Sequence, residues 1–305
     1  MTTAPTPIVV LGPTASGKSD VAMAHAQVSS RREIVVVDAM QVYRGMDIGT
    51  AKPSAADRAR IPHHALDLVE PSDEFAVVDF VTAARRALDD IAARGGQAVL
   101  VAGTGLYLRA LTDPMEVPGQ WPDVKAALLA RAEAEGSEVL HRELAAADPV
   151  AASKMDPRNT RRVVRALEVV LGSGRAFSSF GPGLDQYPPV AFRQVGLRWQ
   201  RPLLAQRIER RVHQMMEAGL LAEVEHLRSG PKPLSRTARQ ALGYKELIDH
   251  LDGMCSLDEA VDTIVLRTRQ FAVRQERWFR RDPRVRWVDI EQDPVAEVLP
   301  VLSRP

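Results

Sequence analysis

Eight residues near the N-terminus have the types and the spacing of a phosphate-binding loop. They run from Gly12 to Ser19 as GPTASGKS and fit the pattern G-x-x-x-x-G-K-[ST] without a mismatch. The glycines let successive backbone N–H groups point into one hollow, and the positive end of a following helix favours an anion there. Lys18 can bridge the outer phosphate oxygens, and the Ser19 hydroxyl can hold a Mg²⁺ ion. The motif therefore predicts a polyphosphate site that also binds Mg²⁺.

The segments around this loop are those that such a site needs. Apolar runs and helical spacings alternate after the N-terminus, which predicts strands and helices over residues 8–11, 19–28, 33–38, 64–69, 75–94 and 97–102. This order is typical of an α/β fold with a P-loop NTPase-like parallel sheet flanked by helices. The carboxyl ends of parallel strands lie at one edge of the sheet, where ligands bind. Asp38 and Thr104, which follow two of the strands, should therefore lie beside the phosphate loop.

Both of these polar residues have a structural alternative. Asp38 could hold the metal or act as a base, or it could only cap a turn. The Thr104 hydroxyl could be a ligand, but it could equally cap the next helix. Residues 39–53 between them are polar and lack a helical period, which is typical of a long functional loop.

The composition changes at residue 113, where three prolines begin a helical stretch that ends in a segment rich in glycine, serine and proline. We predict a core domain in two parts, residues 1–112 and 190–305, and a mostly helical insertion domain over residues 113–189. The insertion carries a basic cluster that is either a solvated helix face or a contact with a phosphate backbone: Lys154, Arg158, Arg161, Arg162 and Arg165.

Two helices of the second core segment carry polar residues on their apolar faces. Arg211 lies within the apolar arc that begins at Leu204, where a cation needs an anion or a carboxylate partner. It is therefore either a second clamp on the phosphate ligand or part of a structural salt bridge. Gln275 faces inward from the helix predicted over 257–280. It lies beside a basic stripe of Arg267, Arg274 and Arg281, with Arg277 close by. We give equal weight to two roles for Gln275: recognition of a base, and hydrogen bonding of its side-chain amide to backbone groups.

The bulk composition narrows the class of protein. Lysine plus arginine number 40 and aspartate plus glutamate 39, so only local clusters can indicate a nucleic-acid partner. The single cysteine, Cys255, excludes an internal disulfide and a cysteine-built zinc site. No run approaches the ~20 apolar residues of a membrane span. We expect a cytoplasmic protein that acts as a monomer and contacts no membrane.

Beyond the phosphate loop, the sequence resembles the tRNA dimethylallyltransferase family, bacterial type. The matching segments are DAMQVYRGMDIGTAKP at 38–53, IPHH at 61–64, GTGLY at 103–107, RALEV at 165–169 and GYKE at 243–246. They occur in the family's order and extend to about residue 278. Ala39 stands where a serine is common and Ala102 where a glycine is common, so the Ala39 side chain supplies no hydrogen bond.

The resemblance implies transfer of a dimethylallyl group from dimethylallyl diphosphate to the exocyclic amine of the adenosine just 3′ of a tRNA anticodon. Asp38, Thr14 and Arg211 would be the catalytic residues, with Mg²⁺ on Ser19. The diphosphate would lie on Gly12, Pro13, Thr14, Ala15, Ser16, Gly17, Lys18, Ser19 and Arg211. The tRNA would contact Asp38, Ala39, Met40, Gln41, Thr104, Lys125, Arg161, Arg162, Val163, Val164, Arg165, Arg239, Gln240, Gly243, Tyr244, Arg274, Gln275 and Arg277.

Two other functions use the same loop. An adenylate isopentenyltransferase or a nucleoside or nucleotide kinase would bind a phosphate ligand but would not need the basic insertion. A non-catalytic, nucleotide-gated RNA-binding module would have no use for a carboxylate at Asp38. The acceptor that the enzyme modifies separates these alternatives.

Overall fold

The computed structural model describes residues 5–181 and 183–303 of the chain. The chain divides into two compact units: a core unit, residues 1–112 with 189–305, and an insertion unit, residues 113–188. The second boundary differs by one residue from the one predicted from the sequence. Each unit has its own core, so each is described by itself.

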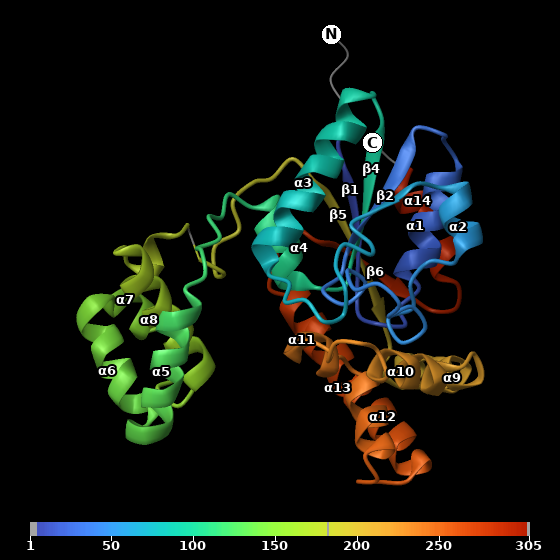
Figure 1. Cartoon of the computed structure of the whole chain (residues 1–305). Coiled ribbons are helices and arrows are strands. Elements are labelled where there is room, and N and C mark those ends of the chain that lie inside the picture. The colour runs from blue at the N-terminus through green and yellow to red at the C-terminus, as the bar shows by residue number, and fades with distance from the viewer. Residues whose placement is uncertain (1–4, 182, 304–305) are drawn as a thin grey trace. The chain divides into compact units, whose positions relative to one another are not determined.

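A six-stranded sheet forms the centre of the core unit, and all its strands are parallel (Figure 1). The strand order is β3-β2-β4-β1-β5-β6, and the strands are β1 (Ile8–Leu11), β2 (Arg32–Val37), β3 (His63–His64), β4 (Gln97–Ala102), β5 (Arg193–Trp199) and β6 (Arg286–Ile290). The central β1 is buried along its whole length, as expected for a parallel strand covered on both faces. The predicted P-loop-like α/β fold is confirmed.

Helices cover both faces of this sheet. In Figure 1, α3 and α4 lie on one face, and α1 and α14 pack together on the other. The core-unit helices are α1 (Lys18–Gln27), α2 (Ala55–Arg60), α3 (Val77–Ala93), α4 (Gly105–Thr112), α9 (Arg201–Glu217), α10 (Leu220–Arg228), α11 (Arg236–Arg239), α12 (Tyr244–Leu251), α13 (Leu257–Phe279) and α14 (Pro294–Leu302). None of the helices in the described part of the chain combines the length and the apolar character that crossing a membrane requires.

The third strand is much shorter than the sequence predicts. The apolar pattern predicts a strand over 64–69, but β3 contains only His63 and His64. Ala65 and Asp67 have φ angles of 63° and 52°, in the left-handed region, which ends the extended conformation. Val69 forms only an isolated parallel bridge, with Tyr43, outside the strands of the sheet.

The insertion unit is an all-helical bundle with its own apolar core. Its helices are α5 (Pro122–Glu135), α6 (Ser137–Ala147), α7 (Pro149–Ala152), α8 (Thr160–Ser173) and the short 3₁₀ turn η1 (Phe177–Ser179). The buried core comes from all four α-helices and consists of Leu128, Leu140, Leu144, Ala152, Val163, Val164, Ala166 and Leu167. The predicted helical character is therefore present, and α8 presents one of its faces to this core.

His25 on α1 makes the stability of the fold depend on pH. Its side chain is buried, neither ring nitrogen has a hydrogen-bond partner among the described residues, and burial lowers its pKa from 6.5 to about 4. Between these two pH values, His25 therefore binds a proton in the unfolded chain but not in the folded chain. We expect the free energy of unfolding to fall by up to about 3 kcal/mol from this group as pH drops from 6.5 to 4.

Denaturant unfolding of His25→Leu at pH 7 and at pH 5 checks this expectation. The variant should lose less stability than the wild type on acidification, since it has no buried imidazole to protonate. His213, which is exposed on α9, is the matched control, and His213→Leu should keep the wild-type dependence. Equal acid sensitivity of wild type and His25→Leu would contradict the assignment.

Candidate active site

The phosphate-loop motif forms a tight turn between β1 and α1, and three of its carbonyl groups accept hydrogen bonds from side chains. The Pro13 carbonyl accepts a hydrogen bond from Lys18 Nζ (3.3 Å), and the Ala15 carbonyl accepts one from Arg207 Nε (2.9 Å). The Ser16 carbonyl accepts one from the indole N–H of Trp199 (2.9 Å). The Arg207 guanidinium also lies over the Trp199 ring. Two side chains from the second half of the core unit, Trp199 and Arg207, therefore hold the loop in place.

The N–H groups of the same loop are left available. Those of Ala15, Gly17, Lys18 and Ser19 have no acceptor among the residues that the structure describes. Ala15 and Gly17 have φ angles of 60° and 88°, and these left-handed conformations turn successive N–H groups to one side. A non-glycine residue in this region is strained and persists where the surroundings enforce it. The result is a hollow of N–H donors at the start of α1, which suits a phosphate group.

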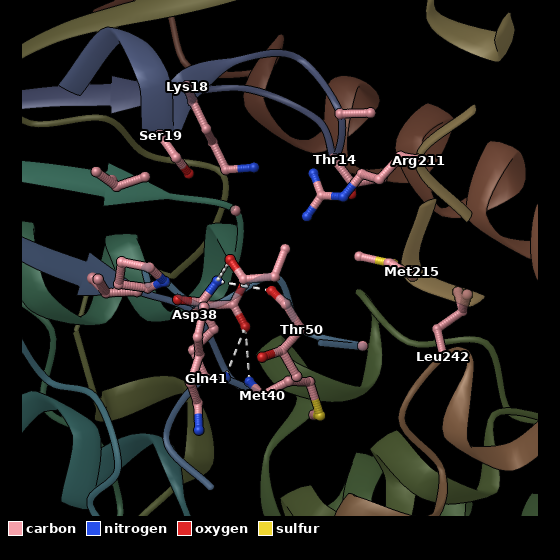
Figure 2. A pocket seen from close by; sticks show the side chains of 18 of the residues that line it. Thr14, Lys18, Ser19, Asp38, Met40, Gln41, Thr50, Arg211, Met215 and Leu242 are labelled. Carbon is pink, nitrogen blue, oxygen red and sulfur yellow. Dashed lines mark hydrogen bonds between the residues drawn. The ribbon is translucent and has the colours of Figure 1, made fainter. Parts of the chain in front are cut away.

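Two cations face this hollow, Lys18 from α1 and Arg211 from α9 (Figure 2). Arg211 makes no ion pair with any carboxylate in the described ranges, 5–181 and 183–303. The salt bridge considered as an alternative is therefore not formed. Burial lowers the pKa of Arg211, opposed by the charges of Asp20 and Asp38. A partly buried guanidinium without a carboxylate partner favours an anionic ligand, and its donors match phosphate geometry.

The environment of Lys18 predicts that the affinity of this loop for a phosphate ligand depends on pH. Burial, and then the nearby Arg211, lower the pKa of Lys18 to about 8, although Asp38 and Asp20 oppose the shift. A bound diphosphate favours the charged form, so binding near pH 8 should take up a proton. We expect the affinity for a diphosphate ligand to fall above pH 8, approaching about tenfold per pH unit.

Calorimetric titration in two buffers of different ionisation enthalpy measures this proton uptake directly. Lys18→Met should bind more weakly and take up no proton, because its side chain cannot titrate. An affinity for dimethylallyl diphosphate that stays constant between about pH 8 and pH 10 would contradict a titrating Lys18.

Asp38 follows β2 at the carboxyl edge of the sheet, and its two carboxylate oxygens differ in what they contact. Oδ1 accepts hydrogen bonds from the N–H groups of Met40 (2.8 Å) and Gln41 (3.3 Å), which is the turn cap considered as the alternative. Oδ2 has no donor among the described residues. Asp38 therefore caps the loop with one oxygen and keeps the other available for a ligand.

The side chains of Asp38 and Lys18 approach each other beside Gly103. A Cβ atom built on Gly103 would lie 3.3 Å from Asp38 Oδ2, 3.4 Å from Lys18 Cε and 3.5 Å from Gln275 Nε2. The three side chains thus converge over this glycine, and any larger residue would crowd them. The Asp38 oxygen without a described donor and the phosphate-loop lysine, Lys18, consequently face the same space.

That space is a cavity of about 670 Å³ in the core unit. A second cavity of about 450 Å³, lined by Ser16 and Gly17, shares Lys18 and Arg211 with it. In Figure 2, Lys18, Thr14 and Arg211 lie on one side of it, and Asp38, Met40 and Gln41 on the opposite side. The apolar part of its wall comes from α1, β2, α9 and α13 and includes Met23, Ile34, Val36, Ile208, Met215, Ile264 and Phe271. The predicted diphosphate cradle and the predicted base therefore share one chamber that also offers apolar surface.

Gln275 has a structural role that the sequence left undecided. Its Oε1 accepts the N–H of Thr14 at 2.9 Å, and its Nε2 donates to the Gly103 carbonyl at 2.7 Å. Both ends of the buried amide are thus used by the backbone, which is the alternative to base recognition. Gln275 joins α13 to the phosphate loop and to the segment after β4, and so it fixes two walls of the cavity.

Ala39, Met40, Gln41 and Thr104 form the side of the cavity around Asp38. The Thr104 hydroxyl accepts the N–H of Ala39 at 3.2 Å, so it ties two loops together. Gln41 Nε2 donates to the Thr50 carbonyl at 2.9 Å. These bonds make the residues after β2 a fixed surface beside the free oxygen of Asp38.

The residues present fit a Mg²⁺ ion that is held mainly by its ligand. The Ser19 hydroxyl is exposed at the start of α1 and bonds to none of the described residues, so it can coordinate an ion. The described part of the chain has no group of three or more His, Cys, Asp or Glu arranged for a metal. Mg²⁺ commonly binds through one protein oxygen, waters and substrate phosphates, which matches this donor set.

The predicted tRNA contacts of the core unit divide into exposed and buried residues. Arg274 and Arg277 are exposed on α13 and form no ion pair with described residues, and Arg274 lies over the Phe271 ring. Arg239 and Gln240 are exposed, and Arg239 forms an ion pair with Asp252 at 3.6 Å. Gly243 and Tyr244 line the cavity. Arg274, Arg277 and Gln240 are therefore accessible to a large ligand, and Arg239 would have to exchange its ion pair with Asp252. Tyr244, which is fully buried, can act only inside the cavity.

In the insertion unit, the structure corrects three of the predicted tRNA contacts. Val163 and Val164 are 0% and 2% exposed in the bundle core, so their side chains cannot contact RNA. Arg165 Nη2 donates to the carbonyls of Pro118 (2.9 Å) and Gly119 (3.0 Å), and Arg165 pairs with Glu168, so its guanidinium is structural. By contrast, three basic residues are exposed and form no ion pair with described residues: Lys125, Arg161 and Arg162.

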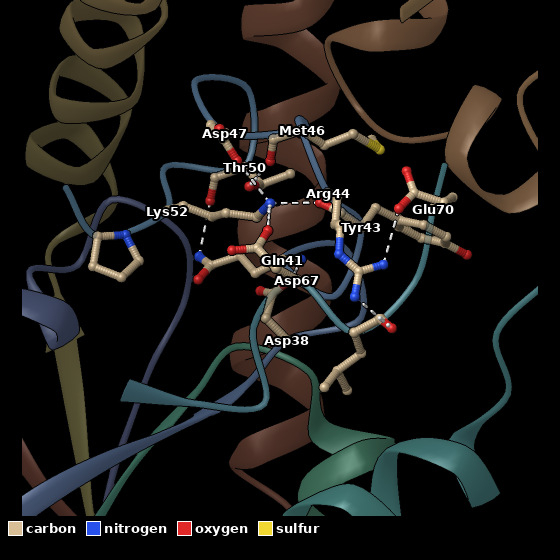
Figure 3. Close-up of polar contacts among 12 residues, drawn as sticks. Asp38, Gln41, Tyr43, Arg44, Met46, Asp47, Thr50, Lys52, Asp67 and Glu70 are labelled. Carbon is tan, nitrogen blue, oxygen red and sulfur yellow. Dashed lines mark hydrogen bonds and ion pairs between the residues drawn. The ribbon is translucent and has the colours of Figure 1, made fainter. Parts of the chain in front are cut away.

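Sequence reasoning missed two residues that hold the loop of residues 39–53. The Lys52 amino group is buried and donates to the Tyr43 carbonyl (2.5 Å) and to Asp47 (2.7 Å) and Asp67 (2.5 Å), as Figure 3 shows. Glu223 on α10 bonds the same loop from the other side. A lysine within a long polar loop was a weak signal for Lys52, but nothing in the sequence pairs Glu223 with residues some 175 positions earlier.

Comparison with known proteins identifies the family of this chain. The family model described as "IPP transferase" matches residues 41–282. The tRNA dimethylallyltransferase of Kineococcus radiotolerans is 45% identical over 97% of both chains, and that of Geobacter metallireducens is 46% identical over 92% of both. The structure of a tRNA isopentenylpyrophosphate transferase from Bacillus halodurans is similar, with a TM-score of 0.68 and 36% identity over 98% of this chain and 96% of that chain. A eukaryotic dimethylallyltransferase acting on tRNA gives a TM-score of 0.76 and 30% identity over 93% of this chain and 73% of that one. The chain therefore belongs to the IPP transferase family, the family of the tRNA dimethylallyltransferases.

Proposed function

We propose that the enzyme transfers a dimethylallyl group from dimethylallyl diphosphate to the exocyclic amine of the adenosine 3′-adjacent to the anticodon of tRNA, releasing diphosphate. The observation that supports this most strongly is one cavity with Lys18, Arg211 and N–H donors on one side and, on the other, an Asp38 oxygen that no described residue bonds. The curated relatives carry the same activity in their names.

The diphosphate leaves from the hollow of the phosphate loop. As the allylic carbon–oxygen bond breaks, negative charge gathers on the diphosphate oxygens, and the N–H groups of the loop, Lys18, Arg211 and the Thr14 hydroxyl stabilise it there. Mg²⁺ on Ser19, when bound, neutralises part of the same charge. These donors are held in place before the reaction by Gln275, Trp199 and Arg207, so little reorganisation is needed.

The acceptor amine reacts from the opposite side of the cavity. The free Oδ2 of Asp38 accepts a hydrogen bond from the adenine amine, directs its lone pair to the allylic carbon and takes the proton after the new C–N bond forms. An aryl amine is a weak nucleophile, so positioning contributes as much as proton removal. The base must leave its stack to enter the cavity.

The rest of the cavity and surface suit the two substrates. The apolar wall between α1, β2 and α9 gives the five-carbon prenyl group a place away from water. Exposed arginines and lysines without ion pairs to described residues on α13, α5 and α8 can contact the phosphates of the anticodon arm. Because all proposed site residues come from one chain and the substrate is tRNA, we propose a cytoplasmic monomer.

The choice of acceptor tests this proposal against its closest alternatives. The protein is incubated with dimethylallyl diphosphate, Mg²⁺ and either a tRNA anticodon stem-loop or free AMP, and the products are analysed by mass spectrometry. We expect one added dimethylallyl group on the stem-loop adenosine and little or none on AMP. Preferential prenylation of AMP would indicate an adenylate isopentenyltransferase, and phosphoryl transfer from ATP to a nucleoside would indicate a kinase.

Binding of the stem-loop should weaken steeply as the salt concentration rises, because each phosphate that a cation neutralises releases counterions. Replacing Arg161 and Arg162 together by alanine should reduce the slope of log K against log salt by roughly 0.7–0.9 for each phosphate that these arginines neutralise in the wild type. Arg131 is the matched control, since its guanidinium already pairs with Glu135 and Glu143. If the double variant and Arg131→Ala have the same slope as the wild type, Arg161 and Arg162 do not contact the RNA.

A further inference from the structure

The Glu223 carboxylate on α10 accepts hydrogen bonds from four donors, which come from two parts of the core unit that are far apart in sequence. Its carboxylate accepts the N–H groups of Asp47 (3.0 Å), Ile48 (2.8 Å) and Gly49 (3.2 Å) and the hydroxyl of Tyr244 (2.6 Å). Hydrogen bonds to a charged acceptor are about twice as strong as neutral ones. A carboxylate with this many donors holds the backbone of residues 47–49 in one position.

Tyr244 adds a steric constraint to the contact between Glu223 and residues 47–49. A Cβ atom built on Gly49 would lie 2.5 Å from the Tyr244 ring, so only glycine allows the loop to pass so close to it. Burial, and then the charge of Glu223, raise the pKa of Tyr244, which keeps its hydroxyl protonated as a donor. Tyr244 is thereby fixed between the loop and α10.

Hydrogen bonds connect the segment that Glu223 holds, residues 47–49, to Asp38. Thr50 follows the clamped residues, and its carbonyl accepts Gln41 Nε2 at 2.9 Å. The N–H groups of Gln41 and Met40 in turn donate to Asp38 Oδ1. Figure 3 shows Gln41, Thr50 and Lys52 close to one another above Asp38. Glu223 itself does not line the cavity, so it cannot contact a substrate there.

We propose that Glu223 is a positioning residue that fixes the loop of residues 39–53, so that the free oxygen of Asp38 and the surrounding wall are held in place for the acceptor base. The inference rests on the proposed prenyl transfer. Because the diphosphate cradle is held separately by Gln275, Trp199 and Arg207, removal of the Glu223 carboxylate should affect the acceptor side alone.

Two kinds of measurement on Glu223→Ala test this role. Hydrogen exchange of the amides of residues 47–49 should speed up at least about tenfold, and this readout needs no substrate. The single-turnover rate with stem-loop should drop by about 10²-fold, the effect of a small misplacement in an active site. The Kd for dimethylallyl diphosphate should stay within about twofold of the wild type. Tyr244→Phe, which removes one of the donors, should show the same pattern more weakly and serves if Glu223→Ala does not fold.

Glu297 is the matched control, because it also accepts three backbone N–H groups, those of Glu291, Gln292 and Asp293, and holds no residue of the cavity wall. Glu297→Ala should lose thermal stability but keep the turnover rate. A Glu223→Ala enzyme that only loses stability as Glu297→Ala does, or one whose diphosphate affinity falls as far as its rate, overturns the proposal. If the wild type prenylates no tRNA, the proposed function fails instead. Even then, unchanged hydrogen exchange at residues 47–49 in Glu223→Ala would refute the role of Glu223 in holding this loop.

Discussion

Replacing Asp38 by alanine should slow the chemical step by roughly 10²–10⁴-fold, the usual contribution of a general base. The affinity for tRNA should change far less, because the basic residues that contact the phosphates lie on other elements. The physical reason is that Asp38 Oδ2 is the free acceptor facing the cavity across from Lys18 and Arg211. Single-turnover kinetics with saturating stem-loop, together with the Kd of the stem-loop, separate the two effects.

Asp38→Asn is the matched variant for this experiment. An asparagine oxygen can still accept the N–H groups of Met40 and Gln41, so the turn that Asp38 caps should survive. The amide cannot take a proton, and so the rate should remain low although the loop is intact. If Asp38→Asn turns over as fast as the wild type, Asp38 is a structural cap and another group must accept the proton. Equal loss of rate and of tRNA affinity in Asp38→Ala would also count against its role as the base.

Removing the guanidinium of Arg211 should have the second largest effect. Arg211→Ala leaves Lys18 as the remaining cation at the inner side of the hollow, and we expect the turnover rate to fall by roughly 10²–10³-fold, as for loss of one donor to a developing anion. The affinity for dimethylallyl diphosphate should fall as well, because Arg211 pairs with no described carboxylate that would compete for it. The pKa of Lys18 should rise in this variant, since Arg211 is one of the groups that lower it.

Arg201 provides the control for Arg211. It lies on the same helix, but it is exposed and lines no part of the cavity. Its charge is screened by water, so Arg201→Ala should change the affinity for dimethylallyl diphosphate by less than about fivefold. Kinetics of Arg211→Ala that match those of Arg201→Ala would remove Arg211 from the site.

Local patterns in the sequence predict several parts of this molecule correctly. The glycine and lysine spacing from Gly12 to Ser19 requires a strand before it and a helix after it, and both are present as β1 and α1. The helical period places Arg211 on the inner face of α9, where the structure has it beside Lys18. Asp38 is predicted at the carboxyl edge of the sheet because it ends a β-branched run, and it directly follows β2.

Features that depend on contacts between distant segments were not predictable in the same way. The choice for Gln275 between base recognition and backbone bonding depends on Thr14, 261 residues away in the chain. The family resemblance assigns Val163 and Val164 to RNA contact, but only the packing of α8 reveals that both are in the core. The left-handed conformations of Ala65 and Asp67, which shorten β3, have no signal because neither residue is glycine.

The central claim is that one cavity holds the departing diphosphate on Lys18 and Arg211 while Asp38 receives the adenosine amine. A crystal structure of the enzyme with a non-reactive thio analogue of dimethylallyl diphosphate, Mg²⁺ and an anticodon stem-loop tests it most directly. We predict the diphosphate on the N–H groups of residues 15–19 and the adenine amine within hydrogen-bonding distance of Asp38 Oδ2. A diphosphate bound outside this hollow, or an adenine amine turned away from Asp38, would contradict the account.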